Sequence, residues 1–426
     1  MSSLPSPIEE TTEDAFPAPL PEFARDLPLG GAMVQSRDTN QAVMDLFEKR
    51  AEIGALVVEE DDKPIGLINR NIFNGHFAKP FHRELYGRKS CIAFMDKSPL
   101  RIEADTPIHT VAARAAEMGA KVVNDGFIVT QAGKALGLVN GVTLLRTMAS
   151  LQEAQHKHLM SSIHYASTIQ RALLSDSRQA ITSTLGDNAA LVWEPRDIVG
   201  GDCFFAKAVP DGLLVGLVDC TGHGVPGAFL TSIAVSELNR ITAQSGRLDP
   251  GAVLTSLNER VKSSLNQKSV ENDGFEEADD GMDAVFAFLD FRERRMKLSS
   301  AKLPIFIQSA DGGIETIKGE RKGIGYRDTP LDQTWQTHEL PMEAGSRLYL
   351  ATDGVSDQIG SARKIAFGWQ RFKASIAAGR EASPAMIVNQ FHAAFLAYQD
   401  SEFRRDDVTM LCIELTDSLM TQGKQS

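Results

Sequence analysis

Four acidic positions in the second half of the chain lie at the ends of apolar runs, each next to glycine or to a second acid. Asp202 follows DIVGG, and Asp219 ends LLVGLV immediately before CTGHG. Asp353 ends RLYLAT before a glycine, while Asp406 and Asp407 precede VTMLCIEL. One Asp-Gly pair after a strand is usually a plain turn. Four such positions in one context favour a shared chemical site.

Oxygen ligands without an accompanying His/Cys cluster suit hard divalent cations, Mg²⁺ or Mn²⁺. Two such ions about 3.5–4 Å apart could position and deprotonate a water for in-line attack on phosphorus. The neighbouring glycines would let the backbone approach the ions, so that a carbonyl could serve as a ligand. The predicted cofactor is therefore a pair of Mn²⁺ or Mg²⁺ ions.

Composition narrows the class of protein. The 426 residues are enough for about two to three domains. The net charge of −12 and the lack of a basic stripe argue against a nucleic-acid partner. No apolar run approaches the ~18 residues of a membrane span, and the four cysteines form no CxxC pair, which favours a reducing cytoplasm. Residues 1–24 are acidic, Pro-rich and without an apolar signal segment, and they predict a disordered tail.

Two segments of the first 150 residues look alike, 40–73 and 108–145. Each predicts an amphipathic helix, an apolar strand, a polar turn and a second strand that contains Gly-Leu. An internal repeat of this length indicates two copies of one small α/β unit. Two unrelated βαβ pieces are the alternative.

This doubled pattern resembles a tandem CBS module over residues 25–148. Such pairs commonly bind adenine nucleotides and regulate an attached domain. Many carry a Thr or Ser after the second strand and an Asp three residues later, which hold the ribose. Here Asn69 and Ile72 occupy those places in the first copy, and Asn140 and Thr143 occupy them in the second. The Asp residue that would bind the ribose is absent from both copies. A small ligand is therefore expected at the pair, but an adenine nucleotide is not specifically predicted.

Residues 142–175 contain neither Gly nor Pro and favour a long helix, with 149–178 as the expected linker. A heptad register from 145 to 173 has six apolar positions of nine, which suits a helix that pairs with its copy in a homodimer. Packing of the helix on its own domain is the alternative. The register positions are Leu145, Met148, Gln152, Gln155, Leu159, Ser162, Ala166, Ile169 and Leu173.

Beyond about residue 186, short apolar runs alternate with turns and helical stretches. The helical stretches are 227–244, 249–266 and 383–398. This mixture predicts an α+β layered sandwich, with domain bounds of 179–418 and a tail at 419–426. The expected strands are AALVWEP, LLVGLVDC, AVFAFLDF, RRMKLSSA, PIFIQS, SRLYLATDG and DDVTMLCIEL.

The motifs VGGDCF, VDCTGHGVPGAFLT, LYLATDGVSD and RRDDVTMLCIEL occur in this order within residues 160–418. They are similar to those of bacterial metal-dependent Ser/Thr phosphatases of the 2C class. The closer likeness is to the subgroup of the stage II sporulation phosphatase and the general-stress sigma-factor phosphatases. This resemblance implies an α-β-β-α phosphatase sandwich.

The resemblance also implies a ligand set, which is at the same time the expected catalytic set. Asp219 matches the aspartate that bridges both metals and holds the attacking water. The backbone carbonyl of Cys220 matches the next ligand. Asp202, Asp353 and Asp406 match the remaining acidic ligands.

For several other residues the sequence leaves more than one role possible. Asp407 ranks behind Asp406 as a ligand. Arg196 could touch the substrate phosphate or serve as a surface or salt-bridging residue. His223 could act as a general acid, although a turn histidine bonded to nearby backbone is preferred. In the acidic segment 271–283, Asp283 is the acid placed to point at the site.

The reaction implied is hydrolysis of phosphoserine or phosphothreonine on a regulatory protein of the anti-sigma-factor-antagonist type, controlled by the CBS pair through the linker helix. A catalytically silent binding module that sequesters a partner is the main alternative. A nucleotide or sugar-phosphate phosphatase is a third, and the absence of a basic pocket disfavours it. The segment SSAKLP (299–304) departs from the AGANNP-like turn usual in the subgroup.

Overall fold

The computed structural model describes residues 20–244, 248–267, 279–362 and 364–421. The chain divides into two compact units, Met1–Leu159 and Met160–Ser426. Each unit is described by itself. The division falls inside the expected linker 149–178, so that segment is shared between the units rather than separate from them.

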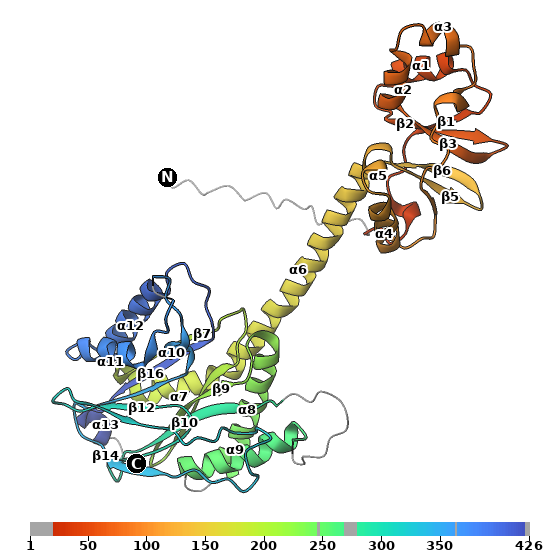
Figure 1. The fold of residues 1–426 in the computed structure, drawn as a ribbon. Helices are drawn as coiled ribbons and strands as arrows, with labels where there is room; N and C mark the ends of the chain where they lie inside the picture. The colour runs from red at the N-terminus through yellow and green to blue at the C-terminus, as the bar shows by residue number, and fades with distance from the viewer. Residues whose placement is uncertain (1–19, 245–247, 268–278, 363, 422–426) are drawn as a thin grey trace, which may run out of the picture. The chain divides into compact units, whose positions relative to one another are not determined.

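Unit 1 consists of short strands and helices in a repeated order (Figure 1). Its elements are the 3₁₀ turns η1 (Ala24–Asp26) and η2 (Cys91–Phe94), the strands β1 (Ala32–Gln35), β2 (Ala55–Glu60), β3 (Lys63–Asn69), β4 (Arg101–Glu103), β5 (Phe127–Gln131) and β6 (Lys134–Val139), and the helices α1 (Asn40–Lys49), α2 (Arg70–Phe77), α3 (His82–Tyr86), α4 (Ile108–Met118), α5 (Ala120–Asp125) and α6 (Gly141–Leu173).

The expected repeat is present in the sheets of unit 1. In the described residues, β1-β2-β3 and β4-β5-β6 form two three-stranded sheets of the same order. In each sheet the first pair is parallel and the second is antiparallel. Even the irregularity repeats, since the register shifts at Val58/Glu59 in one sheet and at Val129/Thr130 in the other. Two copies of one α/β unit explain this better than two unrelated pieces.

The prediction of a disordered tail over residues 1–24 was too long at its inner end. Residues 1–19 lie outside the described residues, but Ala24 is fully buried and Phe23 forms a β-bridge with Pro107. The backbone N–H of Ala24 donates to the carbonyl of Thr106 at 2.9 Å. This segment is ordered because it covers the apolar core of the second copy, where Ala24 packs.

The linker helix begins earlier and ends earlier than expected. Helix α6 runs from 141 to 173, and a separate helix, α7 (Ser175–Leu185), follows it. The helix is interrupted at Leu174, whose side chain is 2% exposed and belongs to the core of unit 2. Burial of this leucine accounts for the change of direction, which the continuous helical propensity of the sequence did not reveal.

Most of the heptad line on α6 is exposed, although Met148 packs against the core of the second copy and Ala166 is half-buried. Leu145, Leu159, Ile169 and Leu173 on this line are all exposed. Leu174 and the neighbouring Gln170 are buried. Packing of the heptad line on the helix's own domain is therefore not what the structure shows for these leucines and Ile169.

Unit 2 contains the strands β7 (Ala189–Glu194), β8 (Asp202–Val209), β9 (Gly212–Cys220), β10 (Met282–Asp290), β11 (Arg295–Ala301), β12 (Ile305–Gln308), β13 (Ile314–Ile317), β14 (His338–Pro341), β15 (Arg347–Ala351) and β16 (Val408–Glu414). Besides α7 and the turn η3 (Gly186–Asn188), its helices are α8 (Gly224–Gln244), α9 (Pro250–Ser264), α10 (Gly354–Asp357), α11 (Gly368–Ala378), α12 (Pro384–Gln399) and α13 (Asp417–Thr421).

The described strands of unit 2 form two five-stranded sheets, β14-β11-β10-β9-β8 (the first sheet) and β13-β12-β15-β16-β7 (the second sheet). Strand β15 shows how the layers are built. Leu348 and Leu350 join the core that contains residues of the first sheet, while Tyr349 and Ala351 join the core under α11 and α12. This alternation is the period of two expected for a strand buried on both faces.

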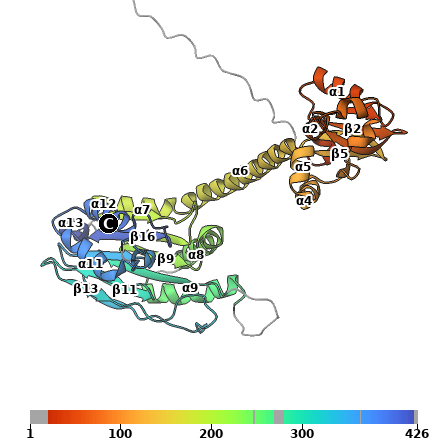
Figure 2. The same cartoon turned by 45° about the horizontal axis from the view of Figure 1, so that its top comes forward.

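Helices cover the outer faces of both sheets. Helices α8 and α9 contact the first sheet, and α12 contacts the second; Figures 1 and 2 show the former pair in green and α11 and α12 in blue. Local side chains stabilise the starts of two of these helices. Asp249 caps α9 and Ser383 caps α12, and each helix has proline at its first position. The expected strands are present, and the mixed α+β sandwich is confirmed.

The proposed tail at 419–426 begins inside the fold. Leu419 is 1% exposed and belongs to the main core of unit 2, while 422–426 lie outside the described residues.

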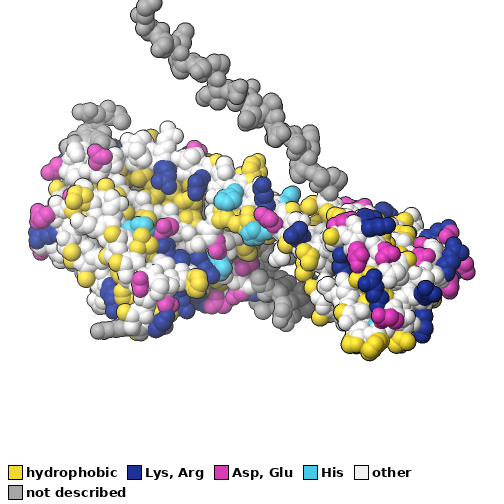
Figure 3. Space-filling view, turned by 90° about the horizontal axis from the view of Figure 1, so that it is seen from above, with side chains coloured by type: hydrophobic (Ala, Val, Ile, Leu, Met, Phe, Trp, Pro, Cys, Tyr) yellow, Lys and Arg dark blue, Asp and Glu magenta, His cyan; other side chains and the backbone are white. Residues whose placement is uncertain are grey.

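Within the described residues, no helix is both long enough and apolar enough to cross a bilayer. On the face shown in Figure 3, Lys and Arg side chains are interspersed with Asp and Glu side chains.

Candidate active site

Three acidic side chains occupy neighbouring places on the first sheet. Asp202 opens β8 and is the direct partner of Asp219 near the end of β9. Asp219 is in turn the direct partner of Asp283 on β10. Directly opposed residues on antiparallel strands present their side chains to the same face, with Cβ atoms about 4.5–5.5 Å apart. The register of the first sheet therefore aligns these three carboxylates in a row.

The second sheet contributes the other acids from the ends of two paired strands. Asp353 follows β15, and Asp406 with Asp407 precedes β16; β15 and β16 are antiparallel, with Ala351 opposite Met410. In an antiparallel pair, the end of one strand lies beside the start of the next. This pairing brings the expected TDG and DDVT motifs together.

Two threonine hydroxyls join the sheets at this point. Thr352 and Thr409 each donate to the same oxygen of Asp202, Oδ2, at 2.7 Å. Asp202 is 2% exposed and both threonines are fully buried. The sequence analysis did not identify these two residues, although each is within two positions of an acid that it singled out.

Asp407 is a positioning residue rather than a free carboxylate. Its Oδ1 accepts a hydrogen bond from the backbone N–H of Arg196 at 2.6 Å. Its Oδ2 accepts from the N–H groups of Gly201 at 2.5 Å and Asp202 at 3.2 Å. A Cβ at Gly200 would lie 2.6 Å from Asp407 Oδ2, so this approach requires glycine. Asp407 is 2% exposed and occupied on both oxygens, which favours Asp406, with its partly exposed side chain, as the ligand.

The carboxylates raise one another's proton affinity. Burial raises the pKa of Asp202 to about 8, and the charge of Asp407 acts in the same direction. Burial, then the charges of Asp202 and Asp353, raise the pKa of Asp219 well above its usual range. Burial also raises the pKa of Asp353 to about 6, against a hydrogen bond with Asp219. In the described part of the chain, none of these three side chains or Asp406 forms an ion pair with Lys, Arg or His.

The donor set fits a hard divalent cation in type and in charge. Asp202 and Asp219 are directly opposed on paired strands, and a cation placed beside two such carboxylates can offset their mutual repulsion. A Cβ at Gly201 would lie 2.8 Å from the carbonyl oxygen of Cys220, so glycine keeps that oxygen open on this side. As the side chains stand, no group of three or more His, Cys, Asp or Glu among the described residues is placed to hold a metal ion.

His223 and Arg196 lie at the edge of this centre. Nδ1 of His223 is 2.8 Å from Oδ2 of Asp197, and both side chains are about half exposed. The preferred expectation, a ring bonded to nearby backbone, was therefore wrong: its partner is a carboxylate. Nη1 of Arg196 donates to the carbonyl of Arg405 at 3.0 Å, which places it beside a cavity that Asp406 also lines. Asp197 was missed, although it stands in the quoted DIVGG sequence.

All four cysteines are buried and free. Burial raises the pKa of the Cys203 thiol and of the Cys220 thiol above their usual range. These thiols are therefore unsuited to nucleophilic attack, and any role of Cys220 in the site belongs to its backbone carbonyl.

The family model of stage II sporulation protein E (SpoIIE) matches residues 210–416. The solved SiaA-PP2C domain of Pseudomonas aeruginosa is 33% identical, with a TM-score of 0.54, and the match covers 61% of this chain and 98% of that one. The PP2C domain of SpoIIE from Bacillus subtilis, solved with a fragment of its regulatory domain, is 16% identical (TM-score 0.43; 54% and 62% covered). The RsbU and RsbW domains of Rv1364c from Mycobacterium tuberculosis are 19% identical (TM-score 0.43; 54% and 60% covered). No curated protein matches the chain.

The match to the SiaA domain spans nearly the whole of that domain, and the SpoIIE family model lies within unit 2. Proteins of this type are metal-dependent hydrolases, in agreement with the oxygen-rich centre described above. The chain belongs to the PP2C family of serine/threonine phosphatases, in its SpoIIE-type branch.

Proposed function

We propose that the chain hydrolyses phosphoserine or phosphothreonine on a regulatory protein, with two Mn²⁺ or Mg²⁺ ions as cofactors. The observation that carries this proposal is the direct register pairing of Asp202 with Asp219, beside the paired strand ends that bring Asp353 and Asp406 together; none of the four acids has a cationic partner in the described residues. The ligands would be Asp202, Asp219, Asp353 and Asp406 with the carbonyl of Cys220.

Bound ions would supply positive charge beside the phosphoryl oxygens and a more acidic water. The chain's own residues do the positioning. Thr352 and Thr409 orient Asp202 by two hydroxyl bonds, and Asp407 holds the backbone at Gly201. His223, oriented by Asp197, is a candidate to protonate the leaving serine or threonine oxygen.

We further propose that the substrate is an anti-sigma-factor-antagonist-like protein of a partner-switching pathway. The SpoIIE family model and the branch it defines support this class of substrate. The binding-module alternative is weaker, because all four acidic positions are present and hydrogen bonds from Trp193, Thr352 and Thr409, with one from its own N–H to Asp407, hold Asp202 in place. The buried, free cysteines suit a reducing compartment such as the cytoplasm.

Unit 1 is proposed as a tandem CBS sensor that binds a small ligand. One cavity of about 350 Å³ is lined by Asn69 and Ile72, and another of about 640 Å³ is lined by Asn140 and Thr143. These are the residues at the equivalent places of the two copies. Both asparagines cap the following helix with their side-chain oxygen. Asp125 lines both cavities and is the acid best placed to bind a ligand hydroxyl.

The route from sensor to active site is proposed to run along α6. Gln170 is 3% exposed, and its Nε2 donates to the carbonyl of Gly200 at 2.7 Å. Its Oε1 accepts from the N–H of Gly200 at 3.3 Å. Because Gly200 and Gly201 precede Asp202, a shift of α6 moves the backbone that carries a proposed metal ligand. The exposed apolar line on α6 would form the interface of a homodimer, so Ile169→Asp should lower the dimer fraction in analytical ultracentrifugation.

The deciding experiment is phosphate release by the full chain with Mn²⁺, with Mg²⁺ and with chelator. The substrates are a phosphothreonine peptide, a phosphorylated antagonist-type protein and a small sugar phosphate. We expect metal-dependent turnover that favours the phosphoprotein and is absent in Asp219→Ala. Turnover of the sugar phosphate alone would point to the small-molecule phosphatase, and tight phosphoprotein binding without turnover to the binding module.

A further inference from the structure

Lys302 lies at the end of the row of acids on the first sheet. Asp202 is opposite Asp219, and Asp219 is opposite Asp283, on successive strands. The next pair in register is Ala284 with Ala301, so Lys302 follows directly at the level of Asp283. Neighbouring strands are about 4.8 Å apart, which places the Lys302 backbone about 10 Å from that of Asp219, within reach of a lysine side chain and one phosphate.

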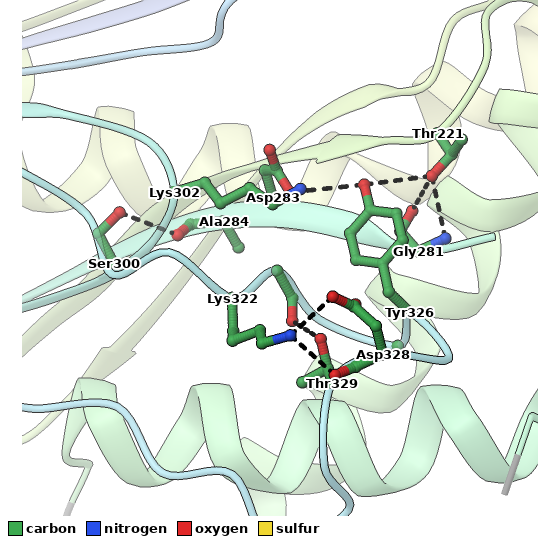
Figure 4. A network of polar contacts seen from close by, with 12 residues as sticks. Thr221, Gly281, Asp283, Ala284, Ser300, Lys302, Lys322, Tyr326, Asp328 and Thr329 are labelled. Carbon is green, nitrogen blue, oxygen red and sulfur yellow. Dashed lines mark hydrogen bonds and ion pairs between the residues drawn. The ribbon is translucent and has the colours of Figure 1, made fainter. Parts of the chain in front are cut away.

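The Lys302 side chain is held in this position by three contacts. Its backbone has a φ of 68°, unusual for a residue other than glycine, and its N–H donates to the carbonyl of Glu320 at 2.8 Å. Its Nζ is 3.0 Å from Oδ1 of Asp283 and 4.3 Å from the centre of the Tyr326 ring. Figure 4 shows Lys302 directed at Asp283, with Tyr326 between Asp283 and Thr221.

Tyr326 ties this lysine environment to the loop after Asp219. Its hydroxyl donates to Asp283 at 3.5 Å and accepts from Thr221 Oγ1 at 3.3 Å. The Thr221 N–H donates to the carbonyl of Gly281 at 2.9 Å, and the Thr221 hydroxyl oxygen accepts from the N–H of Gly281 at 3.0 Å (Figure 4). Lys302 and the chain around Asp219 are therefore parts of one connected network rather than separate surface features.

We propose that Lys302 binds a non-bridging oxygen of the substrate phosphate, an assignment that rests on the proposed phosphatase function. An ammonium group has three donors, of which Asp283 occupies one, and the side chain is 39% exposed, so donors remain for a ligand. A phosphate that enters a row of carboxylates needs cationic donors, and charge-assisted hydrogen bonds are the strong ones. In this proposal Lys302 contacts the substrate phosphate, a role for which the sequence offered Arg196 as the candidate.

The competing explanation is that Lys302 merely offsets the repulsion between Asp219 and Asp283. Like charges directly opposite on paired strands are destabilising, so a counter-ion has value without any contact to substrate. The two explanations differ in what happens when Asp283 loses its charge. A counter-ion becomes dispensable, whereas a phosphate-binding lysine does not.

The chain contains a matched control in the same region. Lys322 forms an ion pair with Asp328 at 2.6 Å and is 40% exposed, close to the 39% of Lys302 (Figure 4). Its Nζ donates to the carboxylate and to the backbone carbonyl of Asp328, and not to the row of acids. Lys322→Met therefore removes an equivalent lysine ion pair without touching the proposed phosphate position.

The test measures the dissociation constant of inorganic phosphate by titration calorimetry, using the full-length chain loaded with Mn²⁺. Lys302→Met should weaken phosphate binding and raise the KM for a phosphothreonine peptide about tenfold, with unchanged Mn²⁺ affinity. Lys302→Arg should retain most of the phosphate affinity, and Lys322→Met all of it. The double variant Asp283→Asn/Lys302→Met should stay as weak as Lys302→Met.

Restored phosphate affinity in the double variant would overturn the proposal in favour of the counter-ion. Unchanged phosphate affinity in Lys302→Met, or no phosphate binding by the Mn²⁺-loaded wild type, would also overturn it. Should Lys302→Met fail to fold by circular dichroism, the comparison of Lys302→Arg with Lys302→Gln takes its place. A wild type without turnover would refute the proposed function, while the phosphate titration still decides the role of Lys302.

Discussion

The two halves of the acidic centre are held in different ways. Asp202 and Asp407 are 2% exposed and bound by hydroxyl and backbone donors of the chain itself. Asp219 and Asp353 are partly exposed, and the neighbour that each presents to the other is a second carboxyl group. The first pair is thus positioned by the fold, whereas the second is positioned for something the chain does not supply. In the proposed cation site, Asp202 would set the geometry because the fold holds it, and Asp219 and Asp353 would contribute affinity because they have no cationic partner in the described residues.

The largest expected effect is on the unpaired half. Asp219→Asn should lower phosphate release about 10³-fold or more, because a proposed ligand of the metal ions would be lost. The same change removes one of several repelling buried charges, so the melting temperature of the metal-free chain should rise or stay level. Steady-state kinetics and thermal melts in chelator check the two parts. A loss of stability as large as the loss of activity would contradict the contrast.

The fold-positioned half should respond in the opposite way. Asp407→Ala leaves three backbone N–H groups without their acceptor and should lower the free energy of unfolding by about 3 kcal/mol, with activity lost as a consequence. Urea denaturation measures this. Asp406→Ala is the matched control, which should lose activity with little loss of stability. Equal stability of both variants would remove the distinction between the neighbouring acids.

The pH dependence of stability sharpens the same comparison. The folded-state pKa values of about 8 for Asp202 and about 6 for Asp353 are raised, so the folded chain binds these protons more tightly than the unfolded chain. The resulting stability is fully present below the unfolded pKa of about 3.9 and is lost as pH rises through about 6 and about 8. Melting temperatures in chelator should therefore fall over this window, and added Mn²⁺ should reverse the fall. A flat profile in chelator would show that burial and mutual repulsion do not raise the pKa values of these carboxyl groups.

The smallest expected effect concerns the hydroxyls that join the sheets. Thr409→Val keeps the shape of the side chain and removes one of two hydroxyl bonds to Asp202, at a cost of about 1 kcal/mol. Mn²⁺ affinity should fall modestly, while Thr352→Val should behave in the same way. Isothermal titration with Mn²⁺ tests both variants. Unchanged affinity in both would show that the buried carboxylate needs no hydroxyl to orient it.

Local patterns predicted most of the scaffold, because strand alternation, helix caps and glycine turns act over a few residues. The strands β9 and β15, which lead to Asp219 and Asp353, and the repeated unit around Asn69 and Asn140 were all predicted from such patterns. The break at Leu174 was not, because it depends on burial of one side chain in a core assembled from distant strands. The ordered segment at Ala24 was missed for the same reason, since its partner, Thr106, lies far along the chain.

The sequence by itself determined which residue types stand near the strand ends, and hence predicted a chemistry of oxygen ligands and divalent cations. Only the tertiary structure decided how the acids divide their tasks. Thr352 and Thr409 reach Asp202 across 150 and 207 positions, and Lys302 meets Asp283 through the register of the first sheet. The reason is that side-chain neighbours across paired strands and packed sheets are set by register and layer contact, which spacing along the chain does not encode.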